Sequence, residues 1–484
     1  MNSNMRDDEV EYHGYNETTP LLSESQHPKS IARSSYWSEL WLLLQYSVPL
    51  IATYLLQYSY CVITTFVAGH LSADDLAAAS IGMTTMNIVG FATIEGMATA
   101  LDTLCAQSYG SGNRLGVGLH VQRMLLLMAL AIIPIGAFWI CSPWILSLFV
   151  RQQHLALMAG SFLRVNLIGL PGYAAFEAGK RFLQAQGDFR AAMIVIIICA
   201  SLNALLSWLF ALKLGMGLDG VALGVAVTNS LRPVLLLLYI VLPLGKYSHQ
   251  CWGGFSRDAL SKWGPTVRLS VAGSAVNLGE WAAFEILTFS TSYLSTNHLA
   301  AQSILTTISV VSWHIPFSVS VAVSTRIGHL IGAGLLPAAR RATALYAVVC
   351  TLIGTVDGII IVALRDLLPA FFSDDPVVCD LASKTMFAVG AFQIIDAIIC
   401  CTNGLLRGLG HQSVAAWVVL AVNYLGSVPA AMWLELGSPG FELNGVWIGL
   451  GCGMVLTAII EGSYMKVLKW QDCVASVKLR EGLQ

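Results

Sequence analysis

Long apolar stretches constrain the fold of this chain more than any other feature. A helix that crosses a bilayer needs about 20 mostly apolar residues. Twelve such stretches occur at about 41–63, 76–100, 119–148, 155–176, 190–213, 218–243, 266–292, 299–325, 340–364, 382–403, 412–434 and 444–468. They do not alternate polar and apolar residues as the strands of a membrane barrel do. The sequence therefore predicts an all-α polytopic membrane protein with twelve transmembrane helices.

The scarcity of charged residues supports the same interpretation. Only 11% of the 484 residues are charged, whereas a soluble domain carries about 25%. The net charge of −2 excludes the basic surface that binds nucleic acid. The eleven cysteines have no spacing typical of metal ligands. We expect no nucleic-acid partner, metal or cofactor.

The positions of Lys and Arg predict the orientation in the membrane. An even number of spans puts both termini on one side, and cytosolic loops carry an excess of these residues. One side would hold Arg114, Arg123, Lys180, Arg181, Arg190, Lys246, Arg257, Lys262, Arg268, Arg340, Arg341 and Arg407 together with the basic residues of the tails. The other side would hold Arg151, Arg164, Lys213, Arg365 and Lys384. We therefore expect both termini in the cytosol.

The two halves of the chain resemble each other. Leu76-Ala-Ala-Ala-Ser-Ile81 recurs as Leu299-Ala-Ala-Gln-Ser-Ile304, and Leu218-Asp-Gly-Val-Ala-Leu-Gly224 as Leu443-Asn-Gly-Val-Trp-Ile-Gly449, at offsets of 223 and 225. A nearly constant offset indicates two parallel six-helix repeats. The predicted organisation is a disordered N-terminal tail (1–40), an N-lobe (41–244), a cytosolic linker (245–265), a C-lobe (266–468) and a cytosolic C-terminal tail (469–484). Paired repeats of this kind predict a transporter with its site between the lobes.

Acidic residues inside the spans are candidates for that function. An ionisable group in the hydrocarbon costs at least ~2.5 kcal/mol, so each one needs a reason to be there. The acids are Glu95, Asp102, Glu177, Glu280, Glu285, Asp357, Asp396 and Glu461, and Arg232 is the main base expected at depth. Buried acids without basic partners can exchange protons and bind organic cations. We expect structural or solvated roles for Asp102, Glu177 and Glu461, and leave Glu95 and Asp357 open.

The seventh stretch carries the sharpest pattern. Asn277 and Glu280 are three residues apart and share a helix face with Phe284. Glu280 and Glu285 lie about 140° apart around the helix. One of the two acids can then face a cleft while the other faces the interior of its lobe. Trp281 is a candidate for aromatic contact with a cation.

The tenth stretch carries a second polar stripe. Gln393, Asp396, Cys400 and Asn403 recur at helical spacing. Asp396 and Glu280 are the acids that we expect to bind the proton or the substrate. Gln393 and Asn403 are candidates for substrate contact beside them.

These segments resemble the eukaryotic branch of the multidrug and toxic compound extrusion (MATE) family. The resemblance covers about residues 40–465. It rests on Val67-Ala-Gly-His-Leu71, Gly96-Met-Ala-Thr-Ala-Leu-Asp-Thr-Leu-Cys-Ala-Gln-Ser-Tyr-Gly110, Phe182-Leu-Gln-Ala-Gln186, Glu280-Trp-Ala-Ala-Phe-Glu285, Ala301-Gln-Ser-Ile304, Arg326-Ile-Gly328, Gly332-Ala-Gly334 and Leu406-Arg-Gly408. It implies a twelve-helix, two-lobed antiporter that expels organic, often cationic compounds in exchange for protons.

The resemblance also implies which residues couple the two fluxes. The acids of the family's seventh helix fall on Glu280 and Glu285, and the acid of its tenth helix falls on Asp396. An acid that some animal members carry corresponds to Thr307 here, and the first-helix Asp of many prokaryotic members would fall near Ile63. These departures favour coupling in the C-lobe, with H⁺ rather than Na⁺ as the coupling ion.

Three other classes of function compete with this one. A lipid-linked oligosaccharide flippase shares the architecture, but it needs a basic cavity for phosphates, and few bases are expected at depth. A membrane-embedded enzyme would need a His-rich cluster, a Ser/His pair or metal spacing, none of which occurs within the stretches. A channel would need a pore-loop signature, which is also missing. We therefore expect a transporter and not an enzyme.

A short motif in the N-terminal tail suggests the destination. Glu17-Thr-Thr-Pro-Leu21-Leu22 resembles an acidic dileucine sorting signal of the kind that directs eukaryotic membrane proteins to vacuoles or lysosomes. We expect a multi-pass protein of the vacuolar membrane, with the plasma membrane as the alternative. Its expected partners are small organic substrates, the lipid bilayer and a sorting adaptor at this tail, and we expect a monomer.

Overall fold

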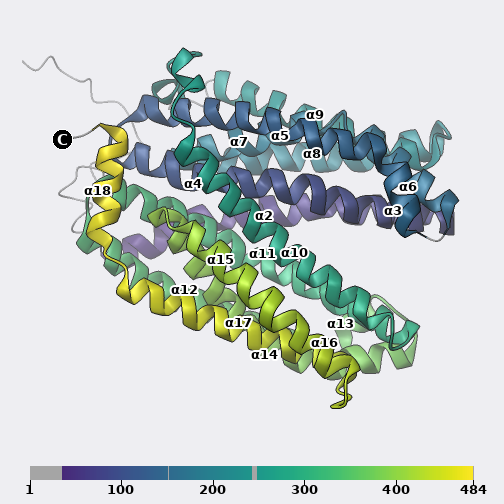
Figure 1. Ribbon diagram of the computed structural model, residues 1–484. Helices are drawn as coiled ribbons and strands as arrows, with labels where there is room; N and C mark the ends of the chain where they lie inside the picture. The colour runs from purple at the N-terminus through teal and green to yellow at the C-terminus, as the bar shows by residue number, and fades with distance from the viewer. Residues whose placement is uncertain (1–34, 151, 243–247, 483–484) are drawn as a thin grey trace, which may run out of the picture.

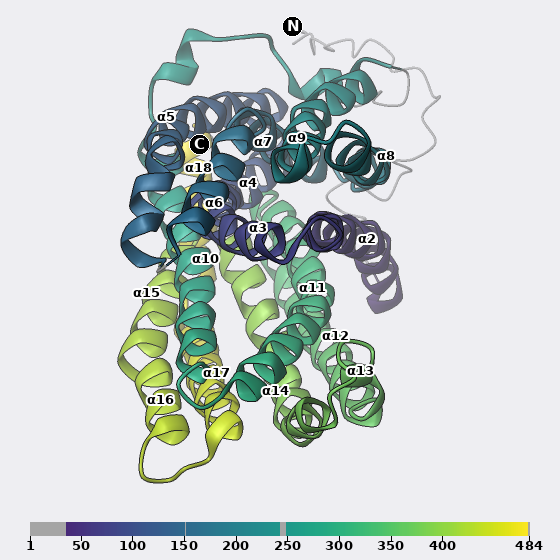
Figure 2. The ribbon, with the colours of Figure 1, turned by 90° about the vertical axis from the view of Figure 1, so that its right-hand side faces the viewer.

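A computed structural model describes residues 35–150, 152–242 and 248–482, and all regular structure within these ranges is helical. The helices form two lobes that diverge from a common end (Figures 1 and 2). The N-lobe consists of α2 (Tyr36–Gly69), α3 (Ala73–Thr85), the π-helical η2 (Met86–Ala92), α4 (Thr93–Gly110), α5 (Arg114–Phe149), α6 (Gln153–Asn166), α7 (Leu170–Ala185), α8 (Arg190–Trp208), the π-helical η3 (Leu209–Lys213) and α9 (Gly217–Val241).

The C-lobe has a similar set of helices. It consists of α10 (Gly264–Thr291), α11 (Thr296–Gly332), α12 (Leu336–Ala363), the short α13 (Leu367–Ala370), α14 (Pro376–Leu409), α15 (Gln412–Val422), the π-helical η7 (Asn423–Ser427), α16 (Val428–Leu436) and α17 (Glu442–Val467). A further helix, α18 (Trp470–Glu481), lies across the end of the molecule. The helical, polytopic fold predicted from the sequence is thus confirmed.

Eleven helical stretches of the described chain are long and apolar enough to cross a membrane. The seventh predicted span forms α10, which is 28 residues long but is not among the eleven. Its interior carries Gly, Ser and Asn residues and the carboxyl groups of Glu280 and Glu285, which make it more polar than its neighbours. The fourth predicted span is interrupted between α6 and α7, where Gly169 precedes Pro171 near the first turn of α7.

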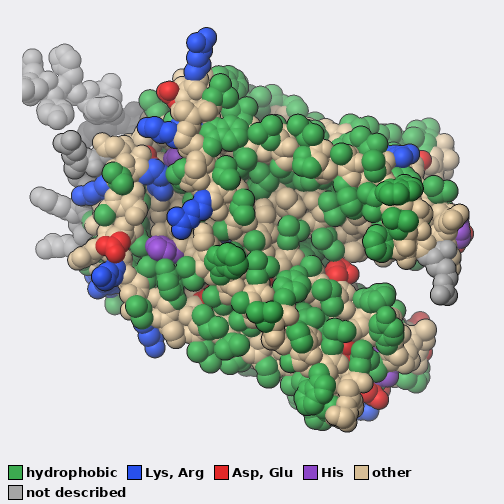
Figure 3. Space-filling model, in the orientation of Figure 1, with side chains coloured by type: hydrophobic (Ala, Val, Ile, Leu, Met, Phe, Trp, Pro, Cys, Tyr) green, Lys and Arg blue, Asp and Glu red, His purple; other side chains and the backbone are tan. Residues whose placement is uncertain are grey.

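The two ends of the molecule differ. We call the end that carries the start of α2 and the helix α18 the terminal face, and the opposite end the open face. At the open face a wedge-shaped cleft separates the two lobes (Figure 3). At the terminal face the lobes are in contact: Arg326 of α11 donates to Glu39 in the first turn of α2, with 3.0 Å between Nε and Oε2. The molecule is therefore closed at one face and open at the other.

Small residues permit the close contact between the lobes. A Cβ atom added to Gly96 of α4 would lie 2.5 Å from Cα of Ser274 in α10. One added to Gly332 of α11 would lie 2.2 Å from the carbonyl oxygen of Gln107 in α4. Real Cβ atoms cannot occupy such positions. Glycine lets these helices approach backbone to backbone.

The segment that joins the two lobes packs against the N-lobe. It contains two 3₁₀ turns, η5 (Ser248–Cys251) and η6 (Arg257–Leu260). Gln122 of α5 donates to the carbonyl oxygen of Gly254 (2.8 Å) and accepts from the amide of Ser256 (3.1 Å). The described part of the linker is therefore attached to α5.

Two expectations need correction here. We expected Arg123, Lys180, Arg181 and Arg407 in cytosolic loops, but they are buried in helices, with 7%, 0%, 1% and 8% of their surface exposed. Residues 36–40 were assigned to the N-terminal tail, but they form the first turn of α2. Hydropathy ended the spans that form α7 and α14 too early, because their polar C-terminal residues face the protein interior rather than water, and it started α2 too late. The predicted sorting motif with Glu17, Leu21 and Leu22 lies outside the described residues.

Candidate functional site

A cavity of about 210 Å³ lies among the helices of the C-lobe. Its walls come from α10, α11, α14, α15, η7 and α17, and Thr99 of α4 is the one lining residue from the N-lobe. We expected a site between the lobes; this cavity lies instead almost wholly within the C-lobe, and the location of the substrate site stays a prediction. Small residues bring the lobes together where α4 meets α10 and α11, whereas the C-lobe helices leave space around their own polar side chains.

All seven side chains predicted for coupling or substrate contact line this one cavity. They are Asn277, Glu280, Trp281 and Glu285 from α10, and Gln393, Asp396 and Asn403 from α14. These side chains of α10 and α14 are more than 100 residues apart in the sequence, so the sequence contains no direct indication that they lie close together. The structure therefore brings the two polar stripes together, while the roles of the residues stay predictions.

The three carboxyl groups of the cavity differ in exposure. Glu285 is exposed, whereas Glu280 and Asp396 are partly buried. Within the described part of the chain, no hydrogen bond or ion pair is found for any of the three. Carboxylates in such a setting have free acceptor sites, which a proton or a cationic ligand can occupy.

Arg407 is a cavity residue that the sequence analysis did not select. It follows Asn403 by four residues and so extends the same stripe of α14 by one turn. Its guanidinium donates to Oγ of Ser320 (2.6 Å) and lies 5.6 Å from the ring centre of Phe317. The helical spacing alone could have identified Arg407 as a cavity residue, but we expected Arg407 in a cytosolic loop and so did not select it.

Aromatic rings form much of the remaining wall. The rings are those of Trp281, Phe284, Trp313, Phe317, Phe392 and Trp447. Trp313 and Phe317 are stacked with 4.4 Å between their centres. Trp447 is held in place because its Nε1 donates to Oε1 of Gln302 (2.9 Å). Aromatic faces beside carboxylates suit flat organic cations.

Several polar atoms of the cavity have no hydrogen-bond partner among the described residues. They include Nε2 of Gln393, Oδ1 of Asn403 and Oγ1 of Thr306. Buried polar groups are normally satisfied by protein, water or ligand. The described residues contain no group of three His, Cys, Asp or Glu side chains that could hold a metal ion.

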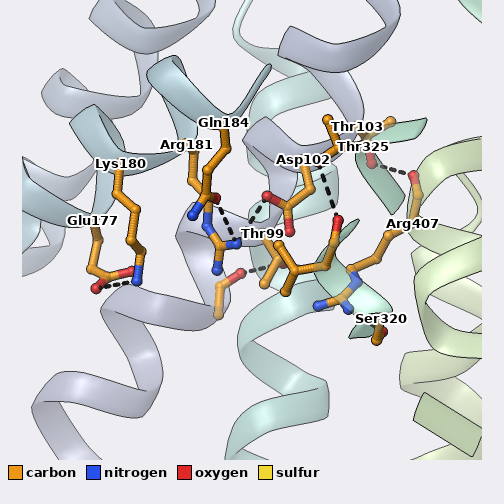
Figure 4. A network of polar contacts seen from close by, with 12 residues as sticks. Thr99, Asp102, Thr103, Glu177, Lys180, Arg181, Gln184, Ser320, Thr325 and Arg407 are labelled. Carbon is orange, nitrogen blue, oxygen red and sulfur yellow. Dashed lines mark hydrogen bonds and ion pairs between the residues drawn. The ribbon is translucent and has the colours of Figure 1, made fainter. Parts of the chain in front are cut away.

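The acids of the N-lobe have a different environment (Figure 4). Glu177 pairs with Lys180 of the same helix at 2.8 Å, and Asp102 of α4 pairs with Arg181 at 3.2 Å. All four side chains are buried. Buried bases thus face buried acids, which corrects the expectation that Arg232 is the main base at depth and excludes the solvated alternative for Asp102 and Glu177.

Neighbouring polar groups complete this network. Nε2 of Gln57 donates to Glu177 at 3.2 Å, and Arg181 donates to the hydroxyl of Tyr54 at 3.1 Å. Arg232 lies over the ring of Tyr60, with 4.2 Å from its Cζ to the ring centre. The charges of Asp102, Glu177, Lys180, Arg181 and Arg232 are therefore held by partners within the N-lobe.

Two further acids of the C-lobe lie outside the cavity lining. Glu461 of α17 is fully buried, and neither of its carboxyl oxygens has a hydrogen-bond partner among the described residues. Thr457, one helical turn earlier, lines the cavity. Asp357 of α12 is 8% exposed and does not line it. Glu461 was expected to be structural or solvated, and its complete burial excludes the solvated alternative.

The MatE family model matches residues 49–209 and 274–433. An uncharacterized transporter of Schizosaccharomyces pombe is 37% identical over 94% of this chain and 86% of its own length. Multidrug and toxin extrusion protein 1 of Xenopus tropicalis is 30% identical over 90% of this chain and 77% of its own length. The crystal structure of the eukaryotic MATE transporter AtDTX14 superimposes with a TM-score of 0.87 at 26% identity, covering 92% of this chain and 99% of that one.

Proposed function

The chain belongs to the MatE family of multi-pass membrane transporters, and we propose that it is an antiporter that exports organic, cationic or xenobiotic compounds in exchange for protons. Members of this family are transporters and not enzymes. In the proposed cycle the two lobes rock, so that the C-lobe cavity faces the two sides of the membrane alternately. Proton and substrate compete for Glu280 and Asp396, and this competition couples the flux of protons to the flux of the exported compound.

One observation carries this proposal: three carboxyl groups and one base line a single cavity in the C-lobe. Glu280, Glu285 and Asp396 give the cavity an excess of acid over Arg407. Aromatic rings next to these acids favour organic cations over inorganic ones. The paired acids of the N-lobe are less suited to release a proton, because their basic partners stabilise the charged form. Coupling therefore belongs to the C-lobe, with H⁺ preferred to Na⁺.

The flippase alternative receives less support from the same cavity. A lipid-linked oligosaccharide carries phosphates, which bind to Arg and Lys side chains. Arg407 is the one Lys or Arg among the described lining residues, and its guanidinium already binds Ser320. A cavity with more acid than base repels a pyrophosphate group.

We further propose that the terminal face lies in the cytosol. Lys and Arg side chains gather at this face (Figure 3). The exposed residues of the predicted cytosolic side include Arg114, Arg257, Lys262, Arg340 and Arg341, and the excess persists when the buried Arg123, Lys180, Arg181 and Arg407 are left out of the comparison. The vacuolar membrane is the proposed location and the plasma membrane the alternative, with a sorting adaptor recognising Glu17, Leu21 and Leu22. The protein is proposed to act as a monomer.

Transport by purified protein in liposomes tests the proposed function. With an imposed pH gradient, we expect uptake of members of a panel of organic cations, and we expect a protonophore to abolish it. Replacing Glu280 with Gln removes the titratable group while keeping the shape of the side chain. Glu280→Gln should therefore reduce proton-driven uptake to background, whereas Asp366→Asn, an exposed acid outside the cavity, should leave it unchanged.

Three results would contradict the proposal. Full proton-driven activity of Glu280→Gln would remove this residue from the coupling mechanism. Uptake that follows a sodium gradient and ignores the pH gradient would make Na⁺ the coupling ion. Transfer of a lipid-linked sugar without transport of any cation would favour the flippase.

A further inference from the structure

Helix α18 follows the last span and is anchored to the C-lobe. Its inner face buries Trp470, Cys473 and Val477 in a hydrophobic cluster with residues of α11 and α12 such as Leu330 and Ala339. A Cβ atom on Gly334, just after α11, would lie 3.9 Å from Val474. The helix thus has a fixed seat on the C-lobe and lies across the terminal face (Figures 1 and 2).

The last turn of α18 reaches the other lobe. The carboxyl group of Glu481 accepts hydrogen bonds from Oγ of Ser108 in α4 and Nδ2 of Asn113 at the start of α5, both at 2.7 Å. Nε2 of His120 in α5 lies 3.8 Å from the same carboxyl group. Arg480 adds a hydrogen bond of 2.8 Å to Oε1 of Gln107. Every one of these partners belongs to the N-lobe.

The carboxyl group of Glu481 is buried in this position and has hydrogen-bond donors around it. Its side chain is only 3% exposed, and it receives the two hydrogen bonds described above. Burial alone would raise the pKa of the carboxyl group, but the contacts with His120 and Ser108 and the nearby Arg480 outweigh burial and lower the pKa to about 2. The contact is therefore a charge-assisted one, stronger than a bond between neutral groups.

Gln107 connects this contact to the closure between the lobes. Its Nε2 donates to the carbonyl oxygen of Gly408 in α14 (2.8 Å), while its Oε1 accepts from Arg480. One N-lobe side chain thus binds the C-lobe directly and also binds α18. If the lobes part at the terminal face, α18 cannot keep both its seat on the C-lobe and its bonds to the N-lobe.

We propose that α18 is a latch that holds the two lobes together at the terminal face and so stabilises the conformation whose cleft is open at the opposite face. Opening of the terminal face requires the contacts of Arg480 and Glu481 with α4 and α5 to break. The latch sets the balance between the two conformations, whatever compound the transporter carries.

Distances between spin labels in the full-length protein test the latch. In a variant that retains transport after replacement of its native cysteines, labels at Leu115 and Ala333, which are both exposed, report the separation of the lobes at the terminal face. Labels at Leu115 and Leu479 report whether α18 leaves the N-lobe. Replacing Glu481 with Gln removes the charge and should raise the ratio of the long to the short distance about tenfold for both label pairs.

Matched variants distinguish the latch from a general effect on the helix. Lys478→Ala removes a charge from the exposed side of α18 and should leave both distance distributions unchanged. Arg480→Ala combined with Glu481→Gln should shift them further than Glu481→Gln alone. Unchanged lobe separation in this double variant overturns the proposal, and so does release of α18 from the N-lobe without separation of the lobes. Neither result depends on which substrate or ion the protein transports.

Discussion

At the scale of single residues, the same residue type has different surroundings in the two lobes. Asp102 of the N-lobe is buried beside Arg181, with 3.2 Å between their charged groups. Asp396 of the C-lobe lines a cavity and has no ion pair among the described residues. A buried acid with a fixed base contributes to structure, whereas an acid with free acceptor sites can bind a ligand.

This difference predicts that removing Arg181 lowers the free energy of unfolding by a large amount. Arg181→Ala leaves the carboxylate of Asp102 buried without its partner, which should destabilise the folded protein by about 3–5 kcal/mol. Thermal unfolding in detergent micelles measures the loss. Lys384→Ala breaks an exposed pair with Asp380 and should cost below about 1 kcal/mol.

A second substitution separates the charge effect from lost packing. Asp102→Asn removes the unpaired charge, so the double variant Asp102→Asn/Arg181→Ala should recover part of the stability lost in Arg181→Ala. If the double variant unfolds at a still lower temperature, the ion pair is not the main source of the stabilisation.

The sequence could indicate which residue types matter but not which of them have partners. The polar stripes of α10 and α14 follow from helical spacing, so Glu280 and Asp396 could be selected without a structure. The pairing of Asp102 with Arg181 joins residues 79 positions apart, and spacing along one helix contains no information about such contacts. Burial of Lys180 was also hidden, because hydropathy treats every Lys as a group that faces water.

At the scale of elements, α4 is the helix on which the two lobes meet. Gly96 faces α10, and Gln107 faces α11. Toward the terminal face, the hydroxyl of Thr103 donates to the carbonyl oxygen of Arg407 in α14 at 2.5 Å. These contacts depend on backbones that approach closely, so side-chain volume on this surface of α4 decides whether the terminal face can close.

Added volume at Gly96 should therefore disfavour the closed terminal face. Gly96→Val places methyl groups where Ser274 already lies, and overpacking of this kind costs about 1–3 kcal/mol. Labels at Leu115 and Ala333 should then show a larger share of the long distance. Gly462→Val is a suitable control, because a Cβ at Gly462 meets no atom within 4 Å. An equal shift in both variants would contradict a specific role of the contact.

Most helices could be predicted from the sequence because their apolar stretches are long and continuous. Two features of the helices could not be predicted: the π-helical segments and helix α18. The π-helical η2 and η7 lie inside apolar stretches and leave no trace in composition, since only the hydrogen-bond pattern changes. The apolar residues of α18, such as Trp470, Cys473, Val474 and Val477, are interspersed with polar and charged ones in one short helix, so the sequence indicated only a tail.

At the scale of the whole molecule, the latch has a defined pH range. The pKa of Glu481 is about 2 in the folded protein, below the ordinary Glu value of about 4.3. A carboxyl group whose pKa is lowered in the folded protein stabilises its contact at every pH above its ordinary pKa. This contribution is lost as the pH falls through the pKa of the folded protein. In a His120→Gln background, which removes the titratable imidazole beside Glu481, the distances between Leu479 and Leu115 should therefore stay constant from about pH 8 to pH 5 and lengthen only below about pH 4. Release of α18 between pH 7 and pH 5 would show that another group controls the contact.

The uneven distribution of charge between the lobes has an electrical consequence. Deep in the N-lobe, Glu95, Asp102 and Glu177 are matched in number by Lys180, Arg181 and Arg232, so this lobe moves through the membrane field as a nearly neutral body. The cavity of the C-lobe carries three acids and one base, and its net charge changes when protons or cations bind. Each elementary charge that crosses 100 mV of membrane potential gains or loses about 2.3 kcal/mol. Any voltage dependence of the transport cycle should thus originate in one half of a duplicated molecule.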